Sequence, residues 1–222
     1  MRTQILCLAV IGVGAALVLS GGQDATAAIT GSSHDFSSAA WNNGGGASAE
    51  ICEPCHAPHT DGTYASTDAP LWNRASTTAT FTLYTSGTLT ATDVGQPSGV
   101  SKLCLSCHDG TVALESFAGN SVGTTTYVTG TALLGTDLNN HHPVAFTYDA
   151  TLATNDGGLY DPTSTLSGLA GGGNIDDDLL FGTGNDQLEC SSCHDVHNGY
   201  TQSKLLVMSN ASSALCLTCH NK

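Results

Sequence analysis

The sequence Cys-Ser-Ser-Cys-His-Asp-Val-His, residues 190–197, contains two cysteines, an adjacent histidine and a second histidine three residues later. Its first part, Cys-x-x-Cys-His, occurs four times in the 222 residues, and the other copies begin at Cys52, Cys104 and Cys216. In such a motif the two thiols form thioethers with a haem, and the histidine becomes the first axial ligand of the iron. The sequence therefore predicts four haem c groups and electron-transfer chemistry.

The motifs supply both the attachment points and the proximal ligands. The predicted thioether residues are Cys52, Cys55, Cys104, Cys107, Cys190, Cys193, Cys216 and Cys219. The predicted proximal iron ligands are His56, His108, His194 and His220. Paired cysteines also occur in zinc sites, disulfide frameworks and thioredoxin-like redox pairs. None of these three alternatives requires a histidine directly after the second cysteine, whereas all four copies have one.

The N-terminus has the pattern of a secretory signal peptide, predicted to cover residues 1–27. Arg2 precedes an apolar run from Ile5 to Leu19, and small residues follow at 25–27. The run is short for a membrane span, so we expect cleavage, export and no membrane-spanning segment. The ninth cysteine, Cys7, would leave with the signal, and the mature chain would be one tetrahaem domain of residues 28–222.

Composition predicts a chain that is mostly coil, with a few short helices and strands. Aromatic residues make up 6% and there are 26 glycines, so side chains alone build a thin core and the haem stack is expected to act as the core. Five basic against 19 acidic residues exclude a nucleic-acid partner. The acidic run at 176–178 lacks the spacing of a calcium-binding EF-hand, and we expect a solvated loop there.

An internal duplication divides the chain into two di-haem repeats, about residues 34–119 and 141–222. The first and third motifs share an extra histidine three residues after the motif histidine, and the second and fourth share the frame Ser-x-Leu-Cys-Leu-Ser/Thr-Cys-His. Alternating apolar residues predict short strands at 81–84 and 144–148. Single helical turns are expected at the binding motifs.

The second axial ligands follow by elimination. Nine histidines less four proximal ones leave five candidates. The repeat favours four of them as distal ligands: His34, His59, His142 and His197. His141 is the alternative to His142, which is preferred because Pro143 fixes the backbone just after it. Met208 lies in an apolar run and is predicted to pack in the core. Four bis-histidine haems of low reduction potential are therefore expected.

A histidine three residues after a proximal ligand cannot easily reach the far face of the same haem. We therefore expect His59 to serve the haem on Cys104 and Cys107, and His197 to serve the haem on Cys216 and Cys219. His34 and His142 would then serve the first and third haems. A catalytic iron needs an open position, and the surplus of histidines argues against an enzyme.

The order of these elements resembles the OmcE-type tetrahaem cytochromes over nearly the whole mature chain. The resemblance rests on the motifs with their flanks, Gly-Ser-Ser-His at 31–34, Leu-Trp-Asn at 71–73 and His-Pro-Val at 142–144. It implies a head-to-tail homopolymer, an extracellular filament (nanowire) that carries electrons to redox partner proteins or external metal acceptors. It also aligns His142 with a ligand and suggests that a distal histidine, for which His34 is the candidate, is donated between subunits. A soluble periplasmic electron shuttle shares every motif and is the alternative.

Overall fold

The computed structural model describes residues 28–45, 49–57, 66–118, 120, 123 and 125–221. The expected signal peptide and the candidate ligand His59 lie outside these ranges, so the structure does not bear on either prediction.

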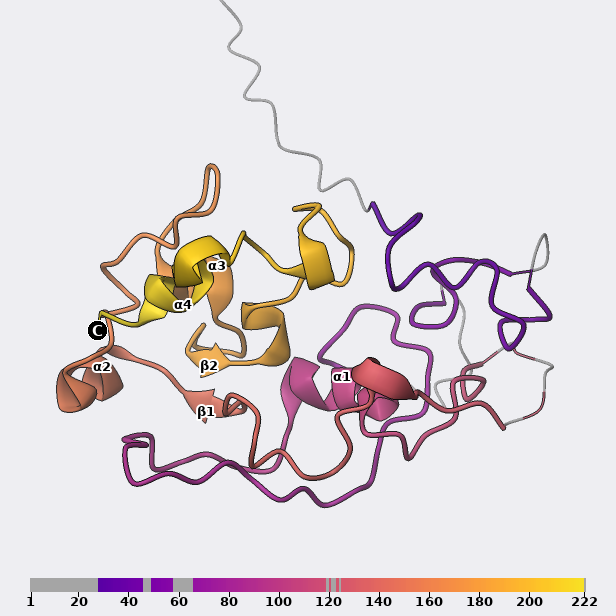
Figure 1. Cartoon of the computed structure of the whole chain (residues 1–222), viewed down its shortest axis with the longest axis horizontal. Helices are drawn as coiled ribbons and strands as arrows, with labels where there is room; N and C mark the ends of the chain where they lie inside the picture. The colour runs from indigo at the N-terminus through magenta and orange to yellow at the C-terminus, as the bar shows by residue number, and fades with distance from the viewer. Residues whose placement is uncertain are drawn as a thin grey trace, which may run out of the picture.

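The described chain is mostly coil, as composition predicts, with short helices and a small sheet (Figure 1). Its α-helices are α1 (Gly99–His108), α2 (Ala150–Asp156), α3 (Ile175–Leu179) and α4 (Ala214–Cys219). Its 3₁₀ turns are η2 (Gly130–Ala132), η3 (Cys190–Ser192), η4 (Ser203–Leu205) and η5 (Ala211–Ser213). Strand β1 (Phe146–Thr147) pairs antiparallel with β2 (Gln187–Leu188), with Phe146 opposite Leu188.

The two repeats interlock rather than forming separate lobes. The segment before α1 runs beneath β1 (Figure 1), where the Thr147 amide donates to the Asp93 carboxylate at 3.0 Å. At the N-terminal end of the described chain, the Ala28 amide donates to the His197 carbonyl at 2.8 Å and the Asn198 side chain donates back to Ala28 at 3.1 Å. Each half of the chain therefore contacts the motif region or the sheet of the other.

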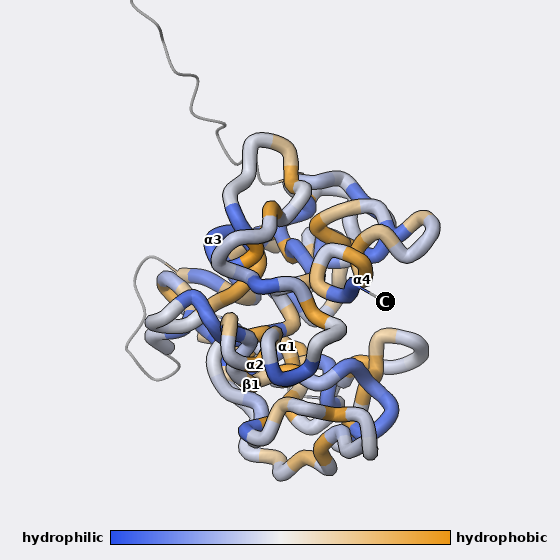
Figure 2. Tube along the Cα trace, turned by 90° about the vertical axis from the view of Figure 1, so that its left-hand side faces the viewer, coloured by the Kyte–Doolittle hydropathy of each residue, from blue (hydrophilic) through white to orange (hydrophobic). Residues whose placement is uncertain are grey.

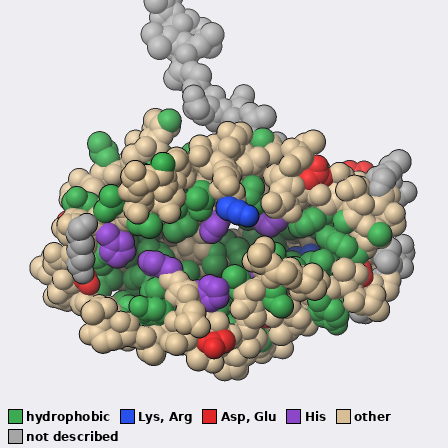
Figure 3. Space-filling view, in the orientation of Figure 1, with side chains coloured by type: hydrophobic (Ala, Val, Ile, Leu, Met, Phe, Trp, Pro, Cys, Tyr) green, Lys and Arg blue, Asp and Glu red, His purple; other side chains and the backbone are tan. Residues whose placement is uncertain are grey.

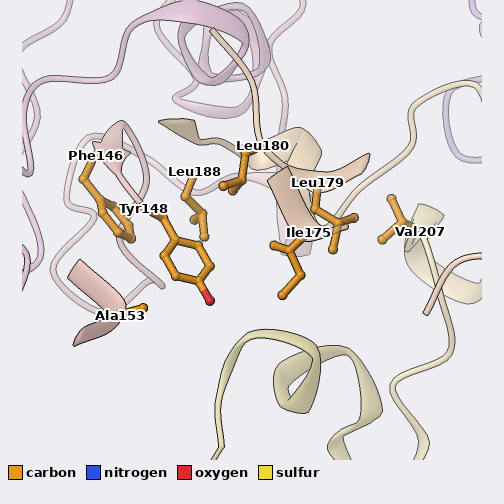
Figure 4. Packing of buried hydrophobic residues seen from close by; sticks show 8 residues of the cluster. All are labelled: Phe146, Tyr148, Ala153, Ile175, Leu179, Leu180, Leu188 and Val207. Carbon is orange, nitrogen blue, oxygen red and sulfur yellow. The ribbon is translucent and has the colours of Figure 1, made fainter. Parts of the chain in front are cut away.

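The side-chain core is divided into two small clusters. The larger one lies in the second repeat and joins β1, α3 and β2 (Figure 4); it contains Phe146, Tyr148, Ala153, Ile175, Leu179, Leu180, Leu188 and Val207. Met208 packs against this cluster, as predicted. The smaller cluster contains Phe81, Leu105 and Leu138. Figure 2 shows hydrophobic and hydrophilic stretches alternating over short distances, which fits two small clusters rather than one broad core.

The local predictions are partly correct. Strand β1 lies inside the predicted segment 144–148, whereas at 81–84 only an isolated bridge from Thr82 to Asp137 forms. The acidic run at 176–178 is not a loop but lies in α3, where its carboxylates occupy the first turn and are favoured by the helix dipole. Helix α1 has ten residues rather than a single turn.

The extra length of α1 depends on a distant carboxylate. Glu189, which is buried, accepts a hydrogen bond from the Ser101 amide at 3.1 Å and so satisfies a donor in the first turn of the helix. Gly99 is required here, because its φ is +51° and an added Cβ would lie 2.8 Å from the Glu189 carboxylate. The contact fixes the second haem motif, at the end of α1, beside the third motif, which begins at Cys190.

Candidate haem sites

A helical turn carries each motif. The motif histidine amide donates to the carbonyl of the first cysteine, at 2.8 Å for His56, 3.1 Å for His194 and 3.0 Å for His220. The second motif ends helix α1 at His108. Positions one, four and five of such a turn lie on one face, so both thiols and the imidazole of a motif face the same side. This is the arrangement that attaches a haem by two thioethers and places histidine against its iron.

The imidazole rings are held by main-chain carbonyls. The Nδ1 atom of His56 lies 2.6 Å from the Pro70 carbonyl, that of His108 lies 2.7 Å from Ala132, and that of His194 lies 3.0 Å from Lys204. A hydrogen bond from Nδ1 to a carbonyl orients the ring and leaves Nε2 as the metal-binding atom. His142 makes the same kind of contact, from Nδ1 to the Pro143 carbonyl at 2.9 Å.

Three proximal histidines face a second histidine. The ring centroids of His34 and His108 are 6.1 Å apart, and those of His142 and His220 are 6.3 Å apart. The rings of His56 and His197 are also 6.1 Å apart and nearly parallel, at 23°. Two imidazoles that bind one metal ion from opposite sides, with bonds of about 2 Å, have centroids about 6 Å apart. All three pairs match this separation.

This geometry differs from the predicted pairing. His34 lies beside His108 rather than His56, His197 lies beside His56 rather than His220, and His142 lies beside His220 rather than His194. The prediction kept every distal histidine within its own repeat, whereas the ring pair of His56 and His197 joins the two repeats. The contacts of Ala28 with residues 197 and 198 bring the start of the described chain to the same region. The ring of His34 lies beside His108 of its own chain, whereas the resemblance suggests that His34 ligates an iron of a neighbouring subunit.

His34 is suited to metal binding by its surroundings. Burial, together with the nearby His108, His194 and His197, lowers the pKa of His34 to about 4. The imidazole is therefore neutral at neutral pH, which is the form that binds iron. His141 is half-buried and donates its amide to the Leu138 carbonyl at 3.0 Å, and no ring pair forms with it among the described residues.

The surface between the motifs is hollowed. In Figure 3 histidine side chains gather along a hollow that crosses the visible face, with hydrophobic side chains between them. Beside His142 a small pocket is lined by Leu83, Val94 and Leu138, among others. Apolar walls with imidazoles at iron-binding separation fit flat, apolar macrocycles with one ligand on each side. Haem attached here would supply the one-electron chemistry of its iron.

The four motifs form a connected set. The thiols of Cys104 and Cys190 are near enough to act on each other, which raises the pKa of Cys104 and lowers that of Cys190 to about 7. Burial raises the pKa of Cys193, and the nearby Cys190 and Cys216 raise it further. The first motif approaches the second, since Cys107 acts electrostatically on Cys55. Every motif thus has a neighbour from another part of the chain.

Sequence reasoning missed the residues that orient these sites. Asn73, fully buried, donates to the carbonyls of Glu53 and Ala118 at 3.2 and 3.1 Å, and so holds the first motif against residue 118. Glu189 was not singled out either, although its place directly before Cys190 was a usable signal. Within the described ranges no group of three or more histidine, cysteine or acidic side chains is arranged to hold a metal ion by itself.

Comparison with known proteins identifies one family pattern. The family model "Doubled CXXCH motif" matches residues 183–222, which contain the third and fourth motifs. No curated protein matches the chain. Among the helices of the described residues, none combines the length and the apolar character needed to cross a membrane. The doubled motif indicates a multihaem c-type cytochrome, a haem-binding electron-transfer protein.

Proposed function

We propose that the protein transfers electrons through four bis-histidine c-type haems, as a subunit of an extracellular cytochrome filament. Electron transfer rather than catalysis is favoured because a second histidine fills the position that a substrate would need. The single observation that carries the proposal is the set of three histidine ring pairs with centroids 6.1 to 6.3 Å apart.

The ring pairs support a specific set of axial ligands. We assign His56 with His197 to the first haem, His108 with His34 to the second, and His220 with His142 to the fourth. This leaves the iron of His194, for which the repeat offers His59 as the counterpart of His197. His141 remains as a spare histidine beside the fourth site.

A conducting filament is supported by the connection of the motifs and by their exposure. Cys52 of the first motif and Cys216 of the fourth are exposed, whereas the cysteines of the second and third motifs are half-buried. Leu217, in the fourth motif, and Leu71, which pairs with the residue after His56, are large exposed apolar side chains. A head-to-tail contact between two such ends does not close on itself and gives an open polymer.

Haem stoichiometry and coordination test the first part of the proposal. Protein purified with its haems should contain four covalently bound haems per chain, give a low-spin spectrum in both oxidation states, and bind no carbon monoxide when reduced. High-spin iron, or strong carbon monoxide binding by the intact protein, would contradict bis-histidine ligation and point to an open site.

Electron microscopy of protein from the cell exterior tests the assembly. Filaments with density for haems along their length would support the conducting subunit. Monodisperse particles found only in the periplasmic fraction would contradict the filament and support the soluble shuttle, with the haem assignment unchanged.

A further inference from the structure

Arg74 is a buried cation in a strongly acidic chain. Lysine and arginine together number five against 19 acidic residues, yet the side chain of Arg74 is only 1% exposed. Burying a charge without an opposite charge is costly, because the group loses its hydration. The burial of Arg74 therefore requires a physical explanation, because solubility alone would place this charge at the surface.

Among the described residues, the hydrogen bonds of Arg74 are all with neutral groups. Its guanidinium donates to the Pro54 carbonyl at 3.1 Å, to the Ala113 carbonyl at 3.2 Å and more weakly to the Leu114 carbonyl, at 3.4 and 3.5 Å. Among the described residues the one ion-pair contact is between His197 and Asp195, so no carboxylate there neutralises Arg74. The Arg74 Nε atom is buried and has no hydrogen-bond partner in the described part of the chain.

Arg74 lies between the first two haem motifs. Pro54 belongs to the first motif, and Ala113 follows the second by a few residues. The guanidinium therefore lies where its charge can act on the haems of both motifs. Two residues before Arg74, the Nε1 atom of the buried Trp72 indole also lacks a partner among the described residues.

The buried positive charge of Arg74, without an ion pair among the described residues, favours an anion close to the first two motifs. A haem bound at either motif would carry two propionate carboxylates, which are anions of the kind that interact with a guanidinium. A cation beside a haem stabilises the iron when it gains an electron, because the reduced form carries one positive charge less than the oxidised form.

We propose that Arg74 is a positioning and electrostatic residue that offsets haem carboxylate charge in the first repeat and raises the reduction potential of a haem there. The inference rests on the proposed haem binding. It departs from the uniformly low potentials expected from bis-histidine ligation, since one haem of the first two motifs should be reduced before those of the second repeat.

The test is a spectroelectrochemical titration of the full, haem-loaded protein and its Arg74→Gln variant. We expect the reduction potential of the highest-potential haem to fall by at least about 59 mV. For a one-electron couple this is a tenfold change in the equilibrium between Fe(III) and Fe(II). Arg74→Lys, which keeps the charge, should shift far less. Lys102→Gln removes an equal charge from the exposed face of α1, where water screens it, and is the matched control.

A shift in Arg74→Gln no larger than that in Lys102→Gln, with four low-spin haems retained, would overturn the inference alone. A protein without covalent haem would overturn the proposed function as well.

A second measurement does not depend on the folding of the Arg74 variant. Replacing the cysteines of one motif by serine should remove the highest-potential component only when that motif is the first or second. Loss of the highest-potential component when the cysteines of the third or fourth motif are replaced would refute the proposal.

Discussion

Replacing His197 by alanine tests whether the haems are ligated across the two repeats. The His197 ring lies 6.1 Å from that of His56, and the ring planes differ by 23°, so the pair matches the separation for one shared iron. The side chain is 51% exposed, and apart from its part in ligation its loss should cost about 0.5 kcal/mol or less in folding stability. The variant should therefore fold, with one iron opened and three unchanged.

The expected result is a stoichiometric change in ligand binding. Reduced His197→Ala protein should bind one carbon monoxide per chain, and one of its haems should become high-spin. His141→Ala, which removes the histidine directly before His142 and without a ring partner in the described structure, should bind none. Titration of the reduced protein with carbon monoxide, followed by absorbance, measures both.

Double variants identify the iron that opens. If His197 serves the first haem, replacing Cys52 and Cys55 by serine in the His197→Ala background should abolish carbon monoxide binding. Replacing Cys216 and Cys219 in the same background should leave it intact. The opposite pattern would refute the reasoning from ring geometry and restore the pairing within the second repeat.

Four further predictions concern ligation, core packing, the backbone at the start of α1 and the haem requirement. His142→Ala should open the fourth iron to carbon monoxide, whereas the same substitution at His141 should not. Ile175→Ala, at a side chain with no exposed surface, should lower the free energy of unfolding by about 2–5 kcal/mol, measured by denaturant titration of the haem-loaded protein. Gly99→Ala should cost about 1–2 kcal/mol through its left-handed backbone, with more from the clash with Glu189. Protein made with all motif cysteines replaced by serine should be rapidly cleaved by protease, because its two small side-chain clusters are not sufficient for folding.

Sequence predicted those features that depend on local composition. The turn residues of the inserts gave the correct expectation of a chain that is mostly coil, and alternation at 144–148 located β1. The strand expected at 81–84 does not form, because only Thr82 pairs with the segment around Asp137, as an isolated bridge. The length of α1 was missed because its first turn is satisfied by Glu189, which lies 88 residues from Ser101 along the chain.

The ring contacts between histidines could not be obtained from repeat symmetry. The symmetry indicated which histidines are special, but it carried the assumption that each repeat serves its own irons. The segment that contains His34 is anchored by Ala28 on residues 197 and 198 of the second repeat, 170 residues away at Asn198. Contacts between residues so far apart in the sequence leave no periodic pattern in it. Arg74 was missed for a related reason, since a single basic residue in a Thr-rich insert has no pattern until its burial is known.

The assignment proposed for the ligands gives the His-x-x-His turns a purpose in electron transfer. His194 and His197 are three residues apart, so their backbone positions can be separated by about 10 Å at most. His197 faces His56, whereas the ring of His194 is held by the Lys204 carbonyl in its own repeat. One turn would thus bind two irons, one from each repeat, and limit the distance between them. Because axial bonds then cross the junction of the repeats, neither repeat alone could form a complete pair of bis-histidine haems. The duplication would produce one continuous electron-transfer unit rather than two independent ones.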